Sequence, residues 1–157
     1  MIAQVNIELL VFKSGKYTLG LDGEEVIEVA NSPKIIPLEK ECVFLEGETF
    51  FRGENIPVVS LGKKLGLPFA DKKGCIIFVS IEDVMFGVLV DSVEDVFEMR
   101  LSELNEFPDF IKYSSGINFI WSIAKKGGEL IPVLDMDNFL NKHEKEIIIK
   151  YRRNINE

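Results

Sequence analysis

The chain has 157 residues, of which 46% are hydrophobic and 28% charged, a composition typical of a folded globular domain and not of a disordered segment. The formal net charge of −8 argues against nucleic acid and anionic membrane surfaces as partners. No stretch is long and apolar enough to cross a membrane, and the start "MIAQVNIELLVF" lacks the basic segment of a signal peptide, so we expect a cytoplasmic protein with no direct membrane insertion.

The first half of the chain predicts short strands joined by tight turns. Apolar and polar residues alternate over residues 5–12, 16–22 and 25–30, and the segments "KSGK" and "LDGEE" between them are typical of turns. Two prolines indicate that "NSPKIIPLEKE" is a loop. The segment "FLEGETFFRGENIPVVSL" then predicts a strand, a turn and a second strand, and "LGKKLGLP" predicts a short helix.

The second half predicts the same elements in the same order. "CIIFVSIEDVMFGVLVDSVEDVFEM" is typical of three strands, and "RLSELNEFPDFIKYSSG" is a longer connection. "INFIWSIAKKGGELIPVLDM" predicts a hairpin that turns at "KKGG", and "DMDNFLNK" begins a short helix. The tail, residues 142–157, carries five basic and three acidic residues, and its run "EIIIKY" is compatible with an edge strand, a helix or a partly ordered end.

Two short sequence motifs occur twice in the chain. "GENIPV" begins at Gly53 and "GELIPV" begins at Gly128, which is 75 residues later. The segments "GLDGEEVIEV" and "GVLVDSVEDV" align without gaps at an offset of 67 residues. Similarity that keeps the same order indicates an internal repeat. The gapless alignment pairs Gly20 with Gly87, Val26 with Val93, Glu28 with Asp95 and Val29 with Val96.

Pro57 and Pro132 occupy the same place in the repeated motif. Proline has no N–H to donate to a strand ladder, so we expect both residues at a strand edge or bulge. A repeat of this size with few helices predicts an all-β fold of two small β-barrels that pack through a shared apolar seam. We place the subdomains at about residues 5–68 and 74–141, followed by the tail 142–157, within a single domain of residues 1–157.

The chain resembles the CheW-like adaptor family of bacterial chemosensory arrays in four stretches: "LLVFKSGKYTLGLDGEEVIEV", "RGENIPVVSLGKKLGL", "FGVLVDSVEDV" and "GGELIPVLDMDNFL". They occur in the family's order and spacing over about residues 9–141. The resemblance implies two five-stranded β-barrel subdomains with a groove between them, and a non-enzymatic scaffold. It also implies two partners, the cytoplasmic tip of a methyl-accepting chemoreceptor and the regulatory domain of a CheA-type histidine kinase, in arrays at the inner face of the membrane.

Two departures from the family pattern lie near the first Pro motif. Phe50-Phe51 precede Arg52-Gly53, where the family often has Asn-Leu. Ser60 stands in the segment "PVVSL" where many members have Asp. These differences leave the expected fold unchanged.

Catalytic and cofactor chemistry has little support in the sequence. His143 is the sole histidine and lies in the polar tail, so neither a His-based triad nor a His-ligated metal site is expected. Cys42 and Cys75 lack the spacing of a metal or redox motif, and we expect two free thiols. Neither GxxxxGK(S/T) nor GxGxxG occurs, so we predict no enzyme, no cofactor and no metal. The alternative is a small-barrel binder of a ligand or an oligonucleotide, as in OB-type folds.

The predicted interface centres on Arg52. Neighbouring phenylalanines give this arginine an apolar setting in which a desolvated charge needs a partner, and the resemblance places Glu28 on an adjacent strand. We expect a partly buried Glu28–Arg52 pair, which either shapes the receptor groove or is an ordinary structural ion pair. Valines of outward parity complete the groove, although each is also compatible with the core. The kinase surface is expected on an edge of the first barrel. The predicted receptor groove contains Val26, Glu28, Arg52, Gly53, Val88, Val90 and Val93.

Overall fold

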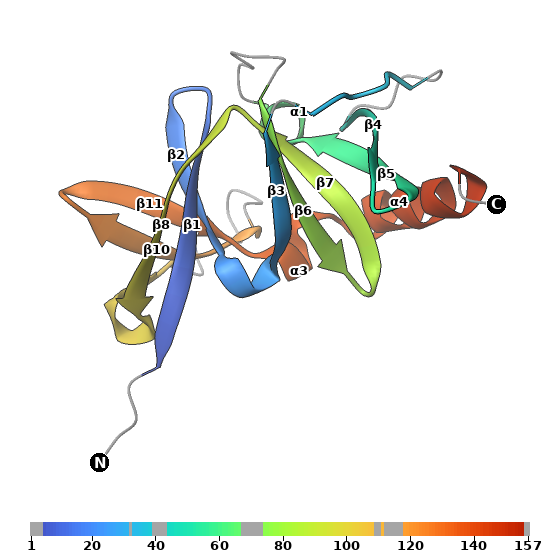
Figure 1. Ribbon diagram of the computed structural model, residues 1–157. Coiled ribbons are helices and arrows are strands. Elements are labelled where there is room, and N and C mark those ends of the chain that lie inside the picture. Colours follow the sequence, from blue (N-terminus) through green and yellow to red (C-terminus); the bar gives the residue numbers. More distant parts are fainter. Residues whose placement is uncertain are drawn as a thin grey trace.

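Two β-sheets pack against each other and make up most of the fold (Figure 1). The mainly β prediction is confirmed, because strands account for most of the described chain and the helices are few and mostly short. The computed structural model describes residues 5–31, 33–38, 44–66, 74–108, 111 and 118–155, so Cys42 and the prediction made for it lie outside the described residues.

The strands divide into a six-stranded and a five-stranded sheet. In spatial order the first sheet contains β8 (Ser92–Arg100), β1 (Asn6–Ser14), β2 (Tyr17–Asp22), β11 (Glu129–Leu134), β10 (Ile120–Lys126) and β9 (Asn105–Glu106). The second contains β3 (Val26–Asn31), β6 (Cys75–Ile81), β7 (Val84–Val90), β5 (Glu54–Ser60) and β4 (Leu45–Phe51). The helices whose bounds lie within the described residues are η1 (Gly23–Glu25), α1 (Leu61–Leu65), η2 (Leu101–Glu103), α3 (Met136–Phe139) and α4 (Lys142–Ile155).

The two sheets match the expected pair of five-stranded units, with one addition. In the first sheet the two-residue strand β9 pairs with β10 and makes a sixth strand. The second sheet has a single antiparallel bridge at the related place, between Ile36 and Glu48 of β4. Within the described ranges no ladder joins the first and last strands of either sheet, so hydrogen bonding alone does not close the expected barrels.

The two halves of the repeat exchange strands. The β1–β2 hairpin of the first half lies between β8 and β11 of the second half, and the β6–β7 hairpin of the second half lies between β3 and β5 of the first. The division at about 5–68 and 74–141 therefore follows the repeat and stays a prediction. The chain passes from the first sheet to the second between β2 and β3, and it returns to the first sheet between β7 and β8.

Two parallel contacts complete the exchange, and each has a glycine at the same place in the repeat. Val133 of β11 lies opposite Gly20 of β2, and Val58 of β5 lies opposite Gly87 of β7. A Cβ at Gly87 would lie 2.6 Å from the Ile76 side chain, and one at Gly20 would lie 3.1 Å from a buried leucine. A small residue is favoured where the exchanged strands meet because core side chains leave little space for a Cβ, most clearly at Gly87.

The repeated prolines lie directly before these parallel contacts. Pro57 and Pro132 lie inside β5 and β11, and the register does not shift at either residue, so neither occupies the predicted bulge. Each pairs only with its antiparallel neighbour, which agrees with the predicted edge position, although both strands lie inside their sheets. Parallel pairing begins one residue later, at Val58 and Val133. A residue without an N–H is tolerated inside these strands because the parallel ladder has not yet begun there.

The described residues form three apolar clusters. The cluster of the first sheet includes Leu9 and Val133, and that of the second sheet includes Ile56 and Phe78. The largest cluster lies between the sheets and also takes side chains from α1, α3 and α4. The sheets thus share one apolar layer, which agrees with the expected seam. Its buried members include Leu10, Phe12, Leu21, Val79, Phe86, Phe139 and Ile148.

We predict that Gly87→Ala destabilises the protein by about 1–3 kcal/mol, the usual effect of forcing a methyl group into a packed core. The added Cβ would contact the β-branched side chain of Ile76, which has little freedom to move. Urea unfolding of Gly87→Ala and of Ser80→Ala, an exposed position on the adjacent strand β6, measures the difference. Equal unfolding midpoints for the two variants would show that the parallel joint does not need a glycine.

Candidate functional site

The β4–β5 turn presents Arg52 and Gly53 at the end of a hairpin. Their φ angles are 51° and 81°, and the related residues of the β10–β11 turn, Gly127 and Gly128, have 57° and 82°. Positive φ at both central residues is the pattern of a type I′ hairpin turn. Arg52 is exposed, and its guanidinium carbon lies 4.9 Å from the centre of the Phe51 ring.

The two phenylalanines before the turn lie on opposite sides of β4. The Phe51 ring stacks on Phe78 of β6 with the ring centres 4.0 Å apart and the planes 10° apart. Phe50 is 70% exposed. Phe51 therefore lies in the apolar environment that was predicted for Arg52, while the arginine side chain is exposed to solvent.

The predicted Glu28–Arg52 ion pair is not formed. Both side chains are exposed, and none of the four ion pairs between described residues includes either of them. In the second half an ion pair forms one residue from the related place, where Lys126 Nζ lies 3.0 Å from Asp95 Oδ2. The hydrogen bond from Lys126 lowers the pKa of Asp95. Lys126 corresponds to Phe51 in the repeat, so the first half lacks the cation that the second half uses.

The valines of the predicted groove fall into two groups. Val88 and Val90 are 2% and 0% exposed, because β7 is the central strand of its sheet and both of its faces are covered. They cannot line an open surface, which corrects that part of the predicted groove. Val26 and Val93, at related positions of β3 and β8, are half-buried against the cluster between the sheets.

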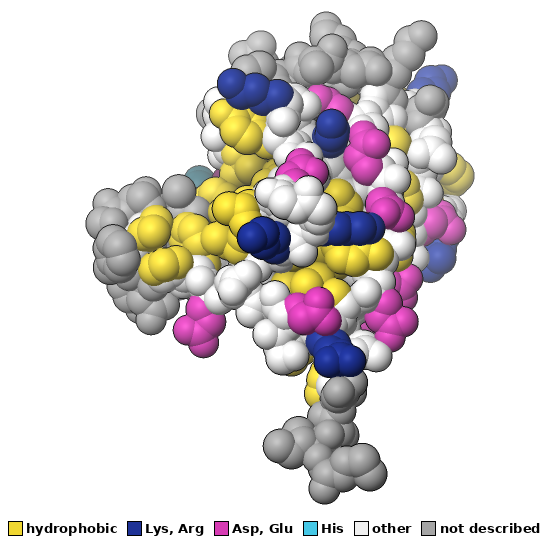
Figure 2. All heavy atoms as spheres, turned by 90° about the vertical axis from the view of Figure 1, so that its left-hand side faces the viewer, with side chains coloured by type: hydrophobic (Ala, Val, Ile, Leu, Met, Phe, Trp, Pro, Cys, Tyr) yellow, Lys and Arg dark blue, Asp and Glu magenta, His cyan; other side chains and the backbone are white. Residues whose placement is uncertain are grey.

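Two exposed apolar residues on the same strands were not among the predicted interface residues. Ile27 of β3 and Val96 of β8 both project from terminal strands of their sheets. The alternation within β3 and the repeat itself could have identified them as surface residues. Figure 2 shows that hydrophobic side chains also run across the face that includes β8, β10 and β11, with acidic side chains along its margin. Apolar surface framed by charged residues is suited to a protein partner.

Helix α4 packs against the β4–β5 hairpin. Arg152 donates to the backbone carbonyl of Asn55 at 3.1 Å and to Glu54 Oε2 at 2.9 Å. The Tyr151 hydroxyl donates to Glu48 Oε2 at 2.7 Å. These bonds connect the last turns of α4 to both strands of the hairpin, so the tail supports the turn that carries the predicted site residues.

The start of α4 is held by a reciprocal capping box. Asn141 Oδ1 accepts a hydrogen bond from the Glu144 N–H at 2.8 Å, and Glu144 Oε1 accepts one from the Asn141 N–H at 2.9 Å. Glu144 also pairs with Lys64 of α1, and Ile148 is buried between the sheets. Of the forms compatible with the tail sequence, the helix is the one observed.

Four carboxylates meet where the chain crosses from the first sheet to the second. Parallel pairing brings the ends of β2 and β11 together, so Asp22 and Glu25 lie near Asp135 and Asp137. Burial, followed by repulsion from these three aspartates, raises the pKa of Glu25 to about 7, although the Met136 N–H donates to its carboxylate. Glu25 Oε2 is buried with no hydrogen-bond partner. The cluster is electrostatically strained at neutral pH.

Within the described part of the chain, no group of three or more His, Cys, Asp or Glu side chains is arranged to hold a metal ion. No described helix combines the length and the hydropathy needed to span a membrane.

Comparison with known proteins identifies the family. A family model described as CheW-like domain matches residues 8–144. The chain belongs to the CheW-like family. The chemotaxis protein CheW of Thermotoga maritima is 34% identical over 139 residues, which cover 86% of this chain and 88% of that protein. The chemotaxis protein CheW of Bacillus subtilis is 26% identical over 143 residues, which cover 88% of this chain and 90% of that protein.

A solved structure supports the same assignment. The crystal structure of the scaffolding protein TtCheW from Thermoanaerobacter tengcongensis matches with a TM-score of 0.76 and 26% identity, covering 89% of this chain and 97% of that one. The resemblance drawn from the four sequence stretches is therefore confirmed, and the two exchanged sheets are a CheW-like fold.

We predict that Arg152, and not Arg52, is the arginine on which the fold depends. Arg152→Ala removes charge-assisted hydrogen bonds from a largely buried side chain and is expected to lower the free energy of unfolding by about 1–3 kcal/mol. Arg52→Ala alters an exposed side chain and is expected to change the free energy of unfolding by less than about 1 kcal/mol. Urea unfolding of both variants checks the order, and the reverse order would contradict the assignment.

We predict that Glu25 makes stability fall between mildly acidic and neutral pH. Its folded-state pKa of about 7 lies above the ordinary value of 4.5, so folding favours the protonated form. This contribution is complete below about pH 4.5 and is lost as the pH rises through 7. Glu25→Gln removes the titration and should be more stable than the unmutated chain at pH 8, by about 1–2 kcal/mol after allowing for solvent screening.

The measurement for Glu25 is thermal or urea unfolding at several pH values. The control is Glu129→Gln, which changes an exposed carboxyl on β11 and should leave the pH profile unchanged. If the Glu25→Gln variant keeps the full pH dependence of the unmutated chain, the carboxylate cluster does not control it.

Proposed function

We propose that the chain is a chemosensory scaffold that couples chemoreceptors to a CheA-type histidine kinase, with no catalytic step of its own. The family match over residues 8–144 carries this proposal. Relatives that align along most of the chain are chemotaxis proteins, and the structural neighbour is a scaffolding protein. The proposal places the protein in the cytoplasm, at receptor arrays along the inner face of the membrane.

The receptor tip in this proposal contacts the exposed part of the predicted groove. Glu28 and the Arg52–Gly53 turn supply the polar contacts, and Val26 and Val93 supply its apolar margin. Ile27 adds an exposed apolar side chain next to Glu28.

The kinase regulatory domain is proposed to contact a different surface, on the outer side of β4. Phe50 and Ile36 are 70% and 48% exposed there. Ile36 lies opposite Glu48. Because Glu48 and Phe50 are two residues apart on β4, their side chains point to the same face, and Ile36 therefore shares that face with Phe50. A separate surface is needed because one patch cannot hold two partners at once, and a few apolar anchors are enough for a small interface.

The alternative function, a small-barrel binder of a ligand or an oligonucleotide, is not favoured. An oligonucleotide groove needs basic and aromatic residues, whereas this chain has a net charge of −8.

The test of the scaffold function uses two variants and two partners. Ile27→Lys should weaken binding of a receptor cytoplasmic fragment by about fivefold or more and leave binding of a kinase regulatory domain unchanged. Phe50→Lys should do the opposite. Calorimetric titration measures both affinities, with thermal midpoints as the control for folding.

Two outcomes would contradict the proposal. If both affinities fall together in a folded variant, the two-surface arrangement is wrong. If the unmutated chain binds neither a receptor fragment nor a kinase domain, the scaffold function itself is wrong.

A further inference from the structure

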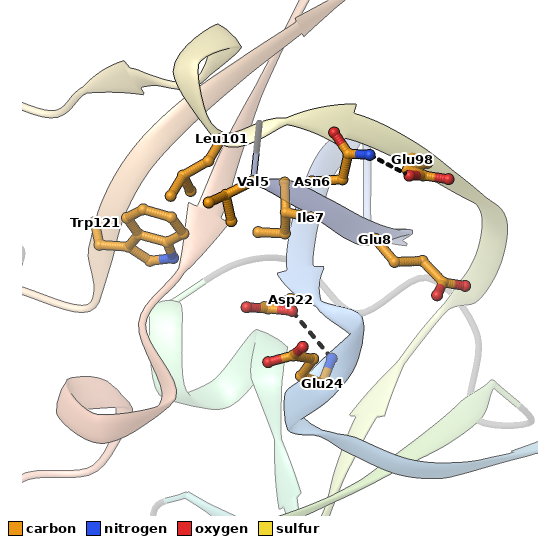
Figure 3. Close-up of a pocket in the computed structure, with 9 residues that line it drawn as sticks. All are labelled: Val5, Asn6, Ile7, Glu8, Asp22, Glu24, Glu98, Leu101 and Trp121. Atoms are coloured by element: carbon orange, nitrogen blue, oxygen red, sulfur yellow. Dashed lines mark hydrogen bonds between the residues drawn. The ribbon is translucent and has the colours of Figure 1, made fainter. Parts of the chain in front are cut away.

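A hollow of about 440 Å³ lies where β1 begins and β2 and β8 end (Figure 3). Its lining residues come from β1, β2, η1, β8, η2 and β10, together with Val5 just before β1. Asp22 and Glu24 belong to the repeated segment "GLDGEEVIEV", but none of the surfaces proposed for the receptor or the kinase includes the hollow.

One side of the hollow is apolar. Figure 3 shows Val5, Leu101 and Trp121 gathered at one end. Val5 is 60% exposed and Leu101 is 42% exposed. The Leu101 N–H donates to the Val5 carbonyl at 2.8 Å, so the backbone holds the two side chains in place. Trp121 packs against the cluster of the first sheet and turns its remaining surface to the hollow.

The rest of the lining is acidic. Glu8 and Glu98 lie directly opposite each other in the β1–β8 ladder, and Asp22 and Glu24 approach from the end of β2. Asn6 donates to Glu98 Oε1 at 2.7 Å, which satisfies only one carboxylate oxygen. Among the described residues, no lysine or arginine lines the hollow, and the side chains of Glu8 and Glu24 have no hydrogen-bond or ion-pair partner.

Such an arrangement does not stabilise the fold. Like charges directly opposite each other in a β-ladder repel and destabilise the sheet. A cation that enters between Glu8 and Glu98 removes this repulsion. The side chains of arginine and lysine suit both parts of the lining, because an apolar stem can pack on an aromatic ring while the charged end meets carboxylates.

We propose that this hollow docks a segment of a partner protein that presents an arginine or lysine beside a large apolar residue. The cation lies among Glu8, Glu24 and Glu98, and the apolar residue packs against Leu101 and Trp121. This surface is additional to the two surfaces of the scaffold function, and its test uses neither the receptor nor the kinase.

Trp121 is the only tryptophan of the chain, so its fluorescence reports directly on the hollow. The full chain is titrated with two short peptides, acetyl-Leu-Arg-Leu-amide and acetyl-Leu-Glu-Leu-amide, at low and at high salt. The arginine peptide is expected to give a saturable change in fluorescence that weakens at high salt. The glutamate peptide is expected to give none. Equal responses to the two peptides, or no response to either, would overturn the proposal.

A matched pair of variants separates docking from a structural role. Glu8→Gln should weaken binding of the arginine peptide by about threefold or more and should raise the thermal midpoint, because the cross-strand repulsion is relieved. Glu129→Gln, which changes an exposed carboxyl outside the hollow, should alter neither. The proposal would be overturned if Glu8→Gln left binding of the arginine peptide unchanged. It would also be overturned if Glu8→Gln lowered the thermal midpoint and Glu24→Gln left peptide binding unchanged.

Discussion

The parallel pairing of β2 with β11 and of β5 with β7 is the constraint on which the other features depend. These two contacts unite strands from opposite halves of the repeat, and each has a glycine where core side chains leave little space for a Cβ. They leave β3 and β8 as terminal strands, so that Glu28 and Val96 are accessible. The β2–β11 contact also brings together the carboxylates that raise the pKa of Glu25.

Much of the fold can be predicted from the sequence, because its elements are specified locally. Alternation of apolar residues and the turn residues identified nearly every strand, and the repeated "GExIPV" motif related the two hairpins. The exchange of strands could not be predicted. Both halves carry the same patterns, so β1–β2 has equivalent partners in its own half and in the other half. Only packing in three dimensions, such as the space at Gly20 and Gly87, distinguishes the two pairings.

The candidate site could be predicted less well than the fold. The repeat correctly indicated that Glu28 and Asp95 occupy related positions, but the ion pair forms only at Asp95. The burial of Arg52 was overestimated, because adjacent phenylalanines do not say which ring faces inward. Here Phe51 is stacked inside and Arg52 remains at an exposed turn. Val88 is buried because β7 is the central strand of its sheet, and β7 has this place only because the two halves exchange strands.

The exchange also sets an order of events during synthesis. Leu10 of β1 pairs with Val96 of β8, which leaves the ribosome 86 residues later, and β2 waits still longer for Val133 of β11. The apolar faces of the first hairpin therefore stay without their native partners until most of the chain has been made. Long-range pairing of this kind slows folding and exposes strand edges meanwhile. A fragment that ends after α1 would leave the first hairpin without its partners β8 and β11.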